Sequence, residues 1–183
     1  CASMCEFRIV GQRNRWSRRG IGADQNHVDF KHTHSGVMLG TISNNIQNKT
    51  KLSVYETIIL ASIIEGESKF KTDMDTISSV YHNRLMKNML LQADPTVQYL
   101  MPKQKKNLLY KDIEIDSPYN TYIYKGLPPG PINSPGMNAI IAASDPAKSS
   151  FLYFVANGDG THIFNHTYKK HLTSKRNVSR KFK

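Results

Sequence analysis

The sequence lacks the features that mark disulfide-rich proteins and membrane spans. It has only two cysteines, Cys1 and Cys5, and both lie at the N-terminal end, where they cannot cross-link the rest of the chain. The most apolar run, Ile58–Ile64, is far shorter than the roughly 20 residues of a membrane-spanning helix. No apolar stretch preceded by basic residues opens the chain, so no signal peptide is predicted. Two thiols without matching partners are also weak evidence for a metal site.

Acidic residues are too few to balance the basic ones, and most of the excess positive charge lies at the two ends of the chain. The net charge is +11, from 25 basic and 14 acidic residues. Residues 1–50 and 172–183 carry most of that excess, while residues 51–171 are nearly neutral. A nucleic-acid-binding domain is expected to carry its basic patch on the folded body. We therefore expect no nucleic-acid partner, and a binder of anionic surfaces would have to use the two ends.

The remaining composition is that of a globular chain with one folded domain. Hydrophobic residues make up 39% of the sequence, which is too many for a disordered chain. Residues 1–50 lack periodicity and form an unassigned N-terminal lead-in, possibly disordered, with a short strand near residues 37–42. Residues 51–171 are predicted to form a single α+β domain. Residues 172–183 are predicted to be a basic, frayed C-terminal tail.

Two long helices are predicted at the start of this domain. Ser53 and Glu56 have the spacing of a capping box and precede a helix over Val54–Gly66. This helix is apolar on most of its sides, which is typical of a buried helix. A second helix is predicted over Thr76–Lys87, capped by Asp75.

Shorter elements follow in the second half of the domain. Proline in the first turn of a helix and an Asn-Gly turn between β-branched runs are the signals used here. The predicted elements are a short helix around Thr96–Leu100, a helix opened by Ser134-Pro135 and ending near Ser144, and a β-hairpin of Phe151–Ala156 with Thr161–Asn165.

Glu65 is the strongest candidate for chemistry. It lies at the end of the predicted buried helix, where a carboxylate loses hydration and meets the negative end of the helix dipole. Both effects favour the protonated form, which a general acid needs. The alternative is a carboxylate that reaches water and pairs with Lys69 or Lys71.

Two further acids lie near Glu65 in the sequence. Glu67 is about 200° further round the helix, so the two carboxylates face apart unless Gly66 bends the chain toward one cleft. Glu67 is interpreted as a supporting or solvent-facing residue. Asp94 precedes a proline and either orients a neighbour or caps the following helix.

The Pro-rich stretch at 116–135 is predicted to be an ordered loop. Tyr119, Tyr122 and Tyr124, with Asn120 and Thr121, provide the flat faces and hydrogen-bonding groups of a sugar-binding groove. Long ordered loops without secondary structure are usually functional. The same side chains are equally suited to packing beneath a rigid loop.

Three histidines near the C-terminus invite a metal interpretation. His162 and His166 are four residues apart, but His162 lies on a predicted strand, along which that spacing spans roughly 13 Å. No acidic residue lies at ligand spacing from His162, His166 or His171. No metal site is therefore predicted.

Four stretches of the sequence together have the pattern of one known family. The pattern resembles the YceG-like endolytic murein (lytic) transglycosylases, lyases that cut the glycan strands of peptidoglycan. The resemblance covers about residues 52–171 and implies a YceG-like catalytic domain with a buried catalytic helix and a groove formed by the Pro-rich loop. The stretches are ASIIEGES (61–68), VYHNRLMKNMLLQADPTVQY (80–99), SPYNTYIYKGLPPGPINSPG (117–136) and LYFVANGDGTHIF (152–164).

The resemblance implies a role for each matching residue. It assigns Glu65 as the catalytic acid and base that forms 1,6-anhydro ends, without a cofactor. Gly66 is helix-weakening and is expected to loosen the placement of Glu65. The residues expected to line the glycan groove are Glu67, Gln92, Asp94, Asn120, Thr121 and Tyr122.

The resemblance also implies a setting for the protein. Peptidoglycan glycan strands are the expected partner, with cell-wall synthases as further candidates. The expected location is the bacterial cell envelope, on the outer face of the plasma membrane, through an anchor that this chain does not show. The alternative is a peptidoglycan-binding module without catalytic activity.

Overall fold

The computed structural model describes residues 50–181, except residues 69, 104, 106 and 107. The described part is an α+β arrangement, as predicted, and the strand expected near residues 37–42 lies outside it. In chain order the elements are α2 (Val54–Glu67), α3 (Lys71–Met86), α4 (Asp94–Tyr99), the 3-10 helix η2 (Tyr110–Asp112), α5 (Met137–Ser144), β1 (Tyr153–Ala156), β2 (His162–Asn165) and α6 (Tyr168–Lys181).

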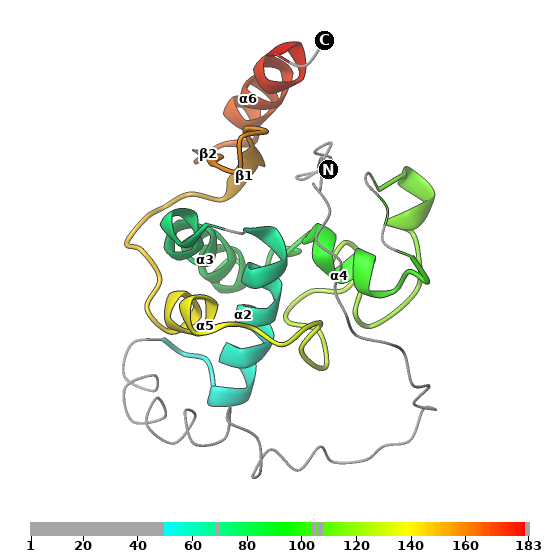
Figure 1. Ribbon diagram of the computed structural model, residues 1–183, viewed down its shortest axis with the longest axis vertical. Helices are drawn as coiled ribbons and strands as arrows, with labels where there is room; N and C mark the ends of the chain where they lie inside the picture. The colour runs from blue at the N-terminus through cyan, green and yellow to red at the C-terminus, as the bar shows by residue number, and fades with distance from the viewer. Residues whose placement is uncertain (1–49, 69, 104, 106–107, 182–183) are drawn as a thin grey trace.

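Helix α2 runs through the middle of the helical part, with α3 and α5 against it (Figure 1). The predicted capping box is present: Glu56 N–H donates to Ser53 Oγ at 3.2 Å, and Ser53 N–H donates to Glu56 Oε2 at 2.8 Å. All residues from Thr57 to Ile64 are buried, which confirms the buried helix. The core around it includes Leu60, Ile63, Ile64, Ile77, Val80, Tyr81, Leu91 and Ala139.

Helix α3 begins at Lys71, five residues before the predicted start. Its N-cap is Phe70, so the predicted cap at Asp75 is wrong, and Asp75 lies exposed within the helix. In the short connection from α2, Phe70 N–H donates to Ser68 Oγ at 3.2 Å. The side of α3 that carries Ile77, Val80, Tyr81 and Arg84 is buried, and Leu85 beside it is half-buried.

Two prolines are placed differently from the prediction. Helix α4 begins at Asp94, with Pro95 in its first turn, where proline is tolerated because its missing N–H would have no helical partner. Helix α5 begins at Met137 with Gly136 as N-cap, so the predicted start at Ser134-Pro135 is wrong. The segment before α5 is instead bound to the side of α2, as described below.

The predicted hairpin is confirmed, with shorter strands. Strands β1 and β2 pair antiparallel, with Tyr153 opposite Asn165 and Ala156 opposite His162. Gly158 and Gly160 in the connecting turn have φ values of 88° and 96°, a conformation that other residues rarely adopt.

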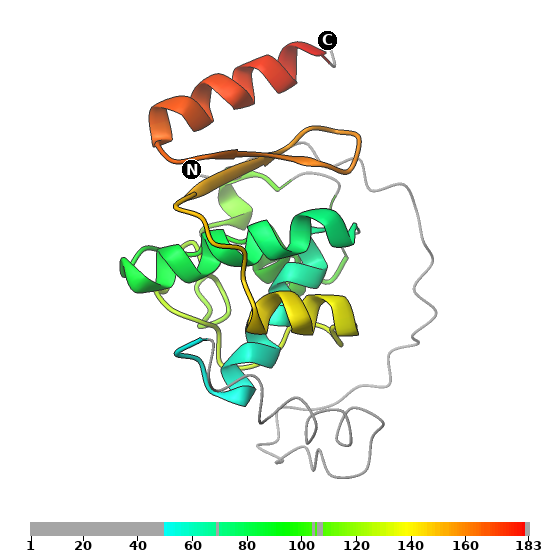
Figure 2. The same ribbon diagram turned by 90° about the vertical axis from the view of Figure 1, so that its left-hand side faces the viewer.

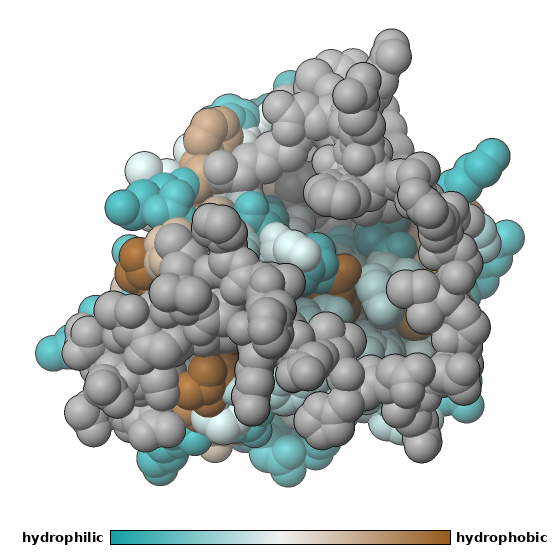
Figure 3. Space-filling view, turned by 60° about the horizontal axis from the view of Figure 1, so that its bottom comes forward, coloured by the Kyte–Doolittle hydropathy of each residue, from teal (hydrophilic) through white to brown (hydrophobic). Residues whose placement is uncertain are grey.

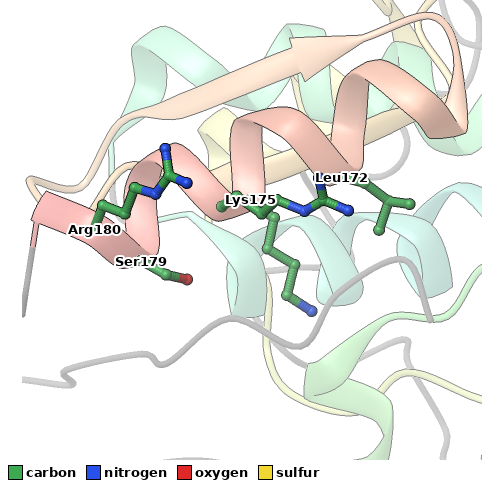
Figure 4. A pocket seen from close by; sticks show the side chains of 5 residues that line it. Leu172, Lys175, Ser179 and Arg180 are labelled. Carbon is green, nitrogen blue, oxygen red and sulfur yellow. The ribbon is translucent and has the colours of Figure 1, made fainter.

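Residues 172–181, predicted to be a frayed tail, are part of helix α6. Helix α6 lies across the hairpin, and the hairpin in turn lies over α3 (Figure 2). His171 is buried, with its ring 5.6 Å from that of Tyr153, and Ser174 Oγ donates to Asn165 Oδ1 at 3.2 Å. A pocket on α6 contains no residue of the site described below (Figure 4). It is lined by Leu172, Lys175, Arg176, Ser179 and Arg180.

The surface carries no continuous apolar face where it can be seen in Figure 3. Brown hydrophobic residues there form separate patches between teal hydrophilic ones, over the part that grey atoms leave visible. Across the described residues, every helix is too short or too polar to cross a membrane.

Candidate active site

The two glutamates of the 61–68 motif face opposite sides of α2. The helix continues through Gly66 to Glu67, so the bend that would bring both carboxylates into one cleft is absent. Residues two apart on a helix lie about 200° apart around its axis. Glu65 is half-buried at the surface, whereas Glu67 is only 5% exposed. The motif therefore presents one carboxyl group to solvent and one to the interior.

The Glu65 side chain is held by the end of the Pro-rich loop. Gly136 N–H donates to Glu65 Oε2 at 3.2 Å. The preceding residues are bound to α2 one turn earlier: Ile132 N–H donates to Ser62 Oγ at 3.0 Å, and Asn133 Nδ2 donates to the Ser62 carbonyl at 2.8 Å. Within the described part of the chain, Glu65 Oε1 has no hydrogen-bond partner.

Gly66 allows α4 to pack directly on the last turn of α2. A Cβ at this position would lie 2.6 Å from Pro95 Cβ and 2.9 Å from Pro95 Cγ. Carbon atoms in contact prefer separations near 3.5–4.0 Å, so only glycine fits without movement of α4. Gly66 therefore does not loosen the end of α2, as the sequence suggested, but allows a close contact that fixes it.

This contact determines whether a Gly66→Ala substitution raises or lowers the free energy of unfolding. Helix propensity alone would stabilise the protein by about 1 kcal/mol. The overlap with Pro95 is expected to reverse that effect and to lower the free energy of unfolding by about 1–3 kcal/mol. Urea unfolding of the two proteins measures the difference, and a more stable Ala variant would contradict the described packing.

The sequence predicted that Glu65 would lose its hydration through burial, but the buried glutamate is Glu67. Tyr81 Oη donates to Glu67 Oε1 at 2.7 Å. Burial, followed by the nearby charge of Asp94, raises the pKa of Glu67 to about 8, against smaller opposing effects of Tyr81 and Arg84. The carboxyl group that stays protonated near neutral pH is therefore Glu67, on the inner side of the helix.

Three of the predicted groove residues lie together next to α4. Asp94 and Tyr122 are both half-buried, and Tyr122 Oη donates to Asp94 Oδ1. Gln92 is half-buried, with a φ of 50°, and its N–H donates to the Thr121 carbonyl at 3.0 Å. The Pro-rich loop is thus attached to the segment that leads into α4.

Asn120 and Thr121 lie beneath this surface and are fully buried. Asn120 Nδ2 donates to the carbonyls of Ile113 and Ile115 at 3.0 and 2.7 Å. Thr121 Oγ1 accepts from Ala93 N–H at 3.0 Å and lies 2.9 Å from Thr96 Oγ1. Their polar groups hold the loop in place from the inside, which is the second of the two interpretations of this loop.

Arg84 and Gly136 were not predicted as parts of the site. Arg84 is 3% exposed and donates to the carbonyls of Leu152, Leu90 and Leu91 at 2.7, 3.2 and 2.8 Å. The sequence signal for this role was the position of Arg84 among apolar residues of the helix. An arginine buried there needs several hydrogen-bond acceptors. The role of Gly136 depends on a contact between distant segments and has no local signal.

The histidines lie apart from these residues. His162 is on β2, as expected, and its Nδ1 is 2.9 Å from Asp73 Oδ2. His166 Nδ1 is 3.0 Å from Ser150 Oγ, while His171 belongs to α6 and packs against the Tyr153 ring. Among the residues that the structure describes, no three His, Cys, Asp or Glu side chains form a group that suits a metal ion.

Comparison with known proteins links this geometry to a family. The model of the YceG-like family matches residues 23–177. The endolytic murein transglycosylase of Bacillus subtilis strain 168 is 50% identical over 127 residues, which are 69% of this chain and 35% of that protein. The endolytic murein transglycosylase of Streptococcus pneumoniae strain D39 is 40% identical over 111 residues, 58% of this chain and 20% of that protein.

A solved structure has the same fold. The crystal structure of a YceG-like protein from Listeria monocytogenes matches with a TM-score of 0.71 and 42% identity, over 76% of this chain and 45% of that chain. The present chain spans about a third of the Bacillus relative and a fifth of the Streptococcus relative. The family model covers most of the sequence, and the chain therefore belongs to the YceG-like family.

Proposed function

We propose that this chain acts as an endolytic peptidoglycan lytic transglycosylase, a lyase, with Glu65 as its catalytic residue. The observation that carries the proposal is the placement of Glu65: a carboxyl group at the surface end of a buried helix, with one oxygen bound by Gly136 N–H and the other without a hydrogen-bond partner among the described residues. Relatives named endolytic murein transglycosylase support the same activity for this domain.

The proposed reaction cleaves the β-1,4 bond between N-acetylmuramic acid and N-acetylglucosamine. Glu65 gives its proton to the glycosidic oxygen as the bond from C1 to that oxygen breaks. The resulting carboxylate accepts the proton of the C6 hydroxyl group of the same N-acetylmuramic acid, and O6 bonds to C1. The product ends in a 1,6-anhydro ring, no water is consumed, and Glu65 returns to its protonated form.

The orientation of the two motif glutamates favours this reaction over hydrolysis. Glycoside hydrolases usually place two carboxyl groups on either side of the scissile bond. Glu67 faces the interior and is bound by Tyr81, so it is not available as the second group. A lyase needs only one, because the substrate supplies the nucleophile.

The groove is proposed to use the half-buried members of the predicted set. Gln92, Asp94 and Tyr122 are half-buried and present polar groups beside α4. Glu67, Asn120 and Thr121 are buried and are proposed to support the groove from inside rather than to touch the glycan.

The proposed setting follows from the substrate. A murein-cutting enzyme works in the bacterial cell envelope, here proposed on the outer face of the plasma membrane through an anchor outside the described residues. Cell-wall synthases remain candidate partners because enzymes that open and extend glycan strands act on the same polymer.

The test is the length of glycan strands after incubation with the purified chain. Uncrosslinked strands of known length are separated by chromatography at successive times. Internal cleavage gives fragments of intermediate length early in the reaction, as the proposal requires. Strands that bind the protein without becoming shorter would contradict it and would favour the non-catalytic binding module.

The hydrogen bond from Gly136 gives a matched pair of variants. Gly136→Ala keeps the N–H, and the added Cβ would lie at an ordinary 3.5 Å from Glu65 Oε2, so most activity is expected to remain. Gly136→Pro fits the φ of −77° but replaces the N–H with a ring carbon that displaces the carboxylate. A fall in initial rate on the order of 100-fold is expected for the proline variant alone. Equal rates for the two variants would show that this contact does not position Glu65.

A further inference from the structure

We infer that Tyr55, Tyr99 and Tyr119 form a second binding site for the glycan strand, remote from Glu65, which holds a sugar ring in an uncleaved stretch of the strand. These three side chains are called the tyrosine cluster below. The site gives the protein a preference for long strands over short fragments. The inference deepens the proposed function and rests on it for the identity of the ligand.

The tyrosine cluster brings together three segments that are far apart in the sequence. Tyr55 lies in the first turn of α2, Tyr99 is the last residue of α4, and Tyr119 belongs to the Pro-rich loop. The rings of Tyr99 and Tyr119 have centroids 5.0 Å apart at an interplanar angle of 39°. The hydroxyl groups of Tyr55 and Tyr119 meet at Gly130, where a Cβ would lie 3.3 and 3.0 Å from them. The three side chains therefore form one surface.

This surface is open to solvent rather than packed into the core. Tyr55 and Tyr99 are 51% and 49% exposed, and Tyr119 is half-buried. Tyrosine hydroxyl groups usually find a hydrogen-bond partner when they are buried in a protein. Among the described residues, the hydroxyl groups of Tyr99 and Tyr119 have none. The cluster thus offers ring faces and hydroxyl groups that packing within the described fold does not use.

The tyrosine cluster and Glu65 lie at the two ends of one side of α2. Tyr55 and Glu65 are ten residues apart, which separates their Cα atoms by about 15 Å along the helix axis and by about 80° around it. The Pro-rich loop follows this side of the helix. At one end Tyr55 Oη donates to the Pro129 carbonyl at 3.3 Å. At the other end Gly136 N–H donates to Glu65 Oε2, and Ser62 accepts from the loop between these two contacts.

Helix α4 makes a second connection between the two ends. Its first turn packs on the end of α2 through the contact of Pro95 with Gly66. Its last residue, Tyr99, belongs to the cluster. A separation of about 15 Å along α2 is longer than one disaccharide unit of a glycan strand. A sugar on the cluster is therefore not one of the two joined by the bond that Glu65 is proposed to cleave.

The chemistry of the cluster suits a neutral sugar. One face of a pyranose ring presents C–H groups, which pack on flat aromatic rings, and its hydroxyl and acetamido groups form hydrogen bonds with tyrosine hydroxyl groups. The three tyrosines and the neighbouring Pro129 and Gly130 carry no charge. A charged polymer would gain nothing from these side chains, so the glycan strand is the occupant that the surface fits.

The test measures the binding of long glycan strands to a protein that does not cut them. Glu65→Gln is the background for every variant, and calorimetry gives the Kd. Tyr99→Leu removes an exposed ring and is expected to raise the Kd by about 10-fold. Tyr99→Phe keeps the ring and is expected to keep most of the affinity. Tyr168→Leu, at a tyrosine of α6 that is 45% exposed, is the control and is expected to bind like the background.

Strand length gives a second measurement, made with Glu65 intact. Tyr99→Leu is expected to lower kcat/KM on long strands by about the same 10-fold, through KM. On the shortest fragment that the wild type cuts, the variant is expected to keep the wild-type kcat/KM, because that fragment does not span the distance to the cluster. An equal loss on long and short substrates would overturn the remote position of the site.

The binding results separate this inference from the proposed function. Equal Kd values for Tyr99→Leu and Tyr168→Leu would overturn the inference whether or not the protein cuts glycan. Equal losses in Tyr99→Leu and Tyr99→Phe would also overturn it, because the ring would then not hold the sugar. Weaker binding in Tyr99→Leu alone, in a protein that cuts no glycan with Glu65 intact, would support the tyrosine cluster and contradict the proposed function.

Discussion

Glu65→Gln is expected to lower the initial rate of glycan cleavage by about 10²–10⁴-fold, because the amide cannot transfer a proton to the glycosidic oxygen. The substitution keeps the size of the side chain and an oxygen that accepts the hydrogen bond of Gly136 N–H. The melting temperature is therefore expected to stay within about 2 °C of the wild type. The measurement is the rate of strand shortening at equal protein concentration.

The matched control for this prediction is Glu114→Gln, which changes the same functional group at an exposed position. It is expected to retain the wild-type rate. If the Glu65 variant is as active as this control, Glu65 has no part in the reaction, and the proposed mechanism fails with it.

Arg84→Met is expected to lower the free energy of unfolding by about 3–5 kcal/mol. The methionine fills part of the space but leaves the carbonyls of Leu152, Leu90 and Leu91 without their buried donor. The cation also lies over the Tyr153 ring, 5.2 Å from its centroid, so the variant loses a link between α3 and the hairpin. Urea unfolding, followed by circular dichroism, measures the change.

Arg180→Met on the exposed side of α6 is the control for Arg84, and a change within about 0.5 kcal/mol is expected there. Similar losses in the two variants would show that the buried carbonyls do not depend on Arg84. Loss of glycan cleavage in the Arg84 variant below its unfolding midpoint would additionally show that α3 positions the groove.

Local patterns predicted the elements that local interactions determine. The capping box and the apolar run define α2, and an Asn-Gly turn between β-branched residues defines the hairpin. These features depend on residues a few positions apart, which the sequence displays directly.

The roles of Glu65 and Glu67 could not be separated in the same way. A helix that is apolar on most sides has no periodicity to show which side of its last turn meets the core. That side is set by the contact of Gly66 with Pro95, which joins two segments separated by a whole helix. The interpretation of Gly66 as a weak point failed for the same reason.

Helix α6 was not predicted, because it is polar on most of its sides. Its sequence is polar and basic, with His171 as its one buried residue, so no apolar stripe predicts a helix. The helix is instead held by contacts with the hairpin, namely the ring contact of Tyr153 with His171 and the hydrogen bond from Ser174 to Asn165. The buried positions of Asn120 and Thr121 likewise depend on carbonyls and hydroxyl groups elsewhere in the fold.

The measurement that tests the central claim most directly is mass spectrometry of the cleaved strand ends. Uncrosslinked glycan strands are incubated with the wild-type chain and with the Glu65→Gln variant. The account predicts 1,6-anhydro-muramic acid ends, lighter than hydrolysed ends by the mass of one water molecule, with the wild type alone. Hydrated ends would contradict it, because water rather than the C6 hydroxyl group would then be the nucleophile and a second carboxyl group would have to activate it.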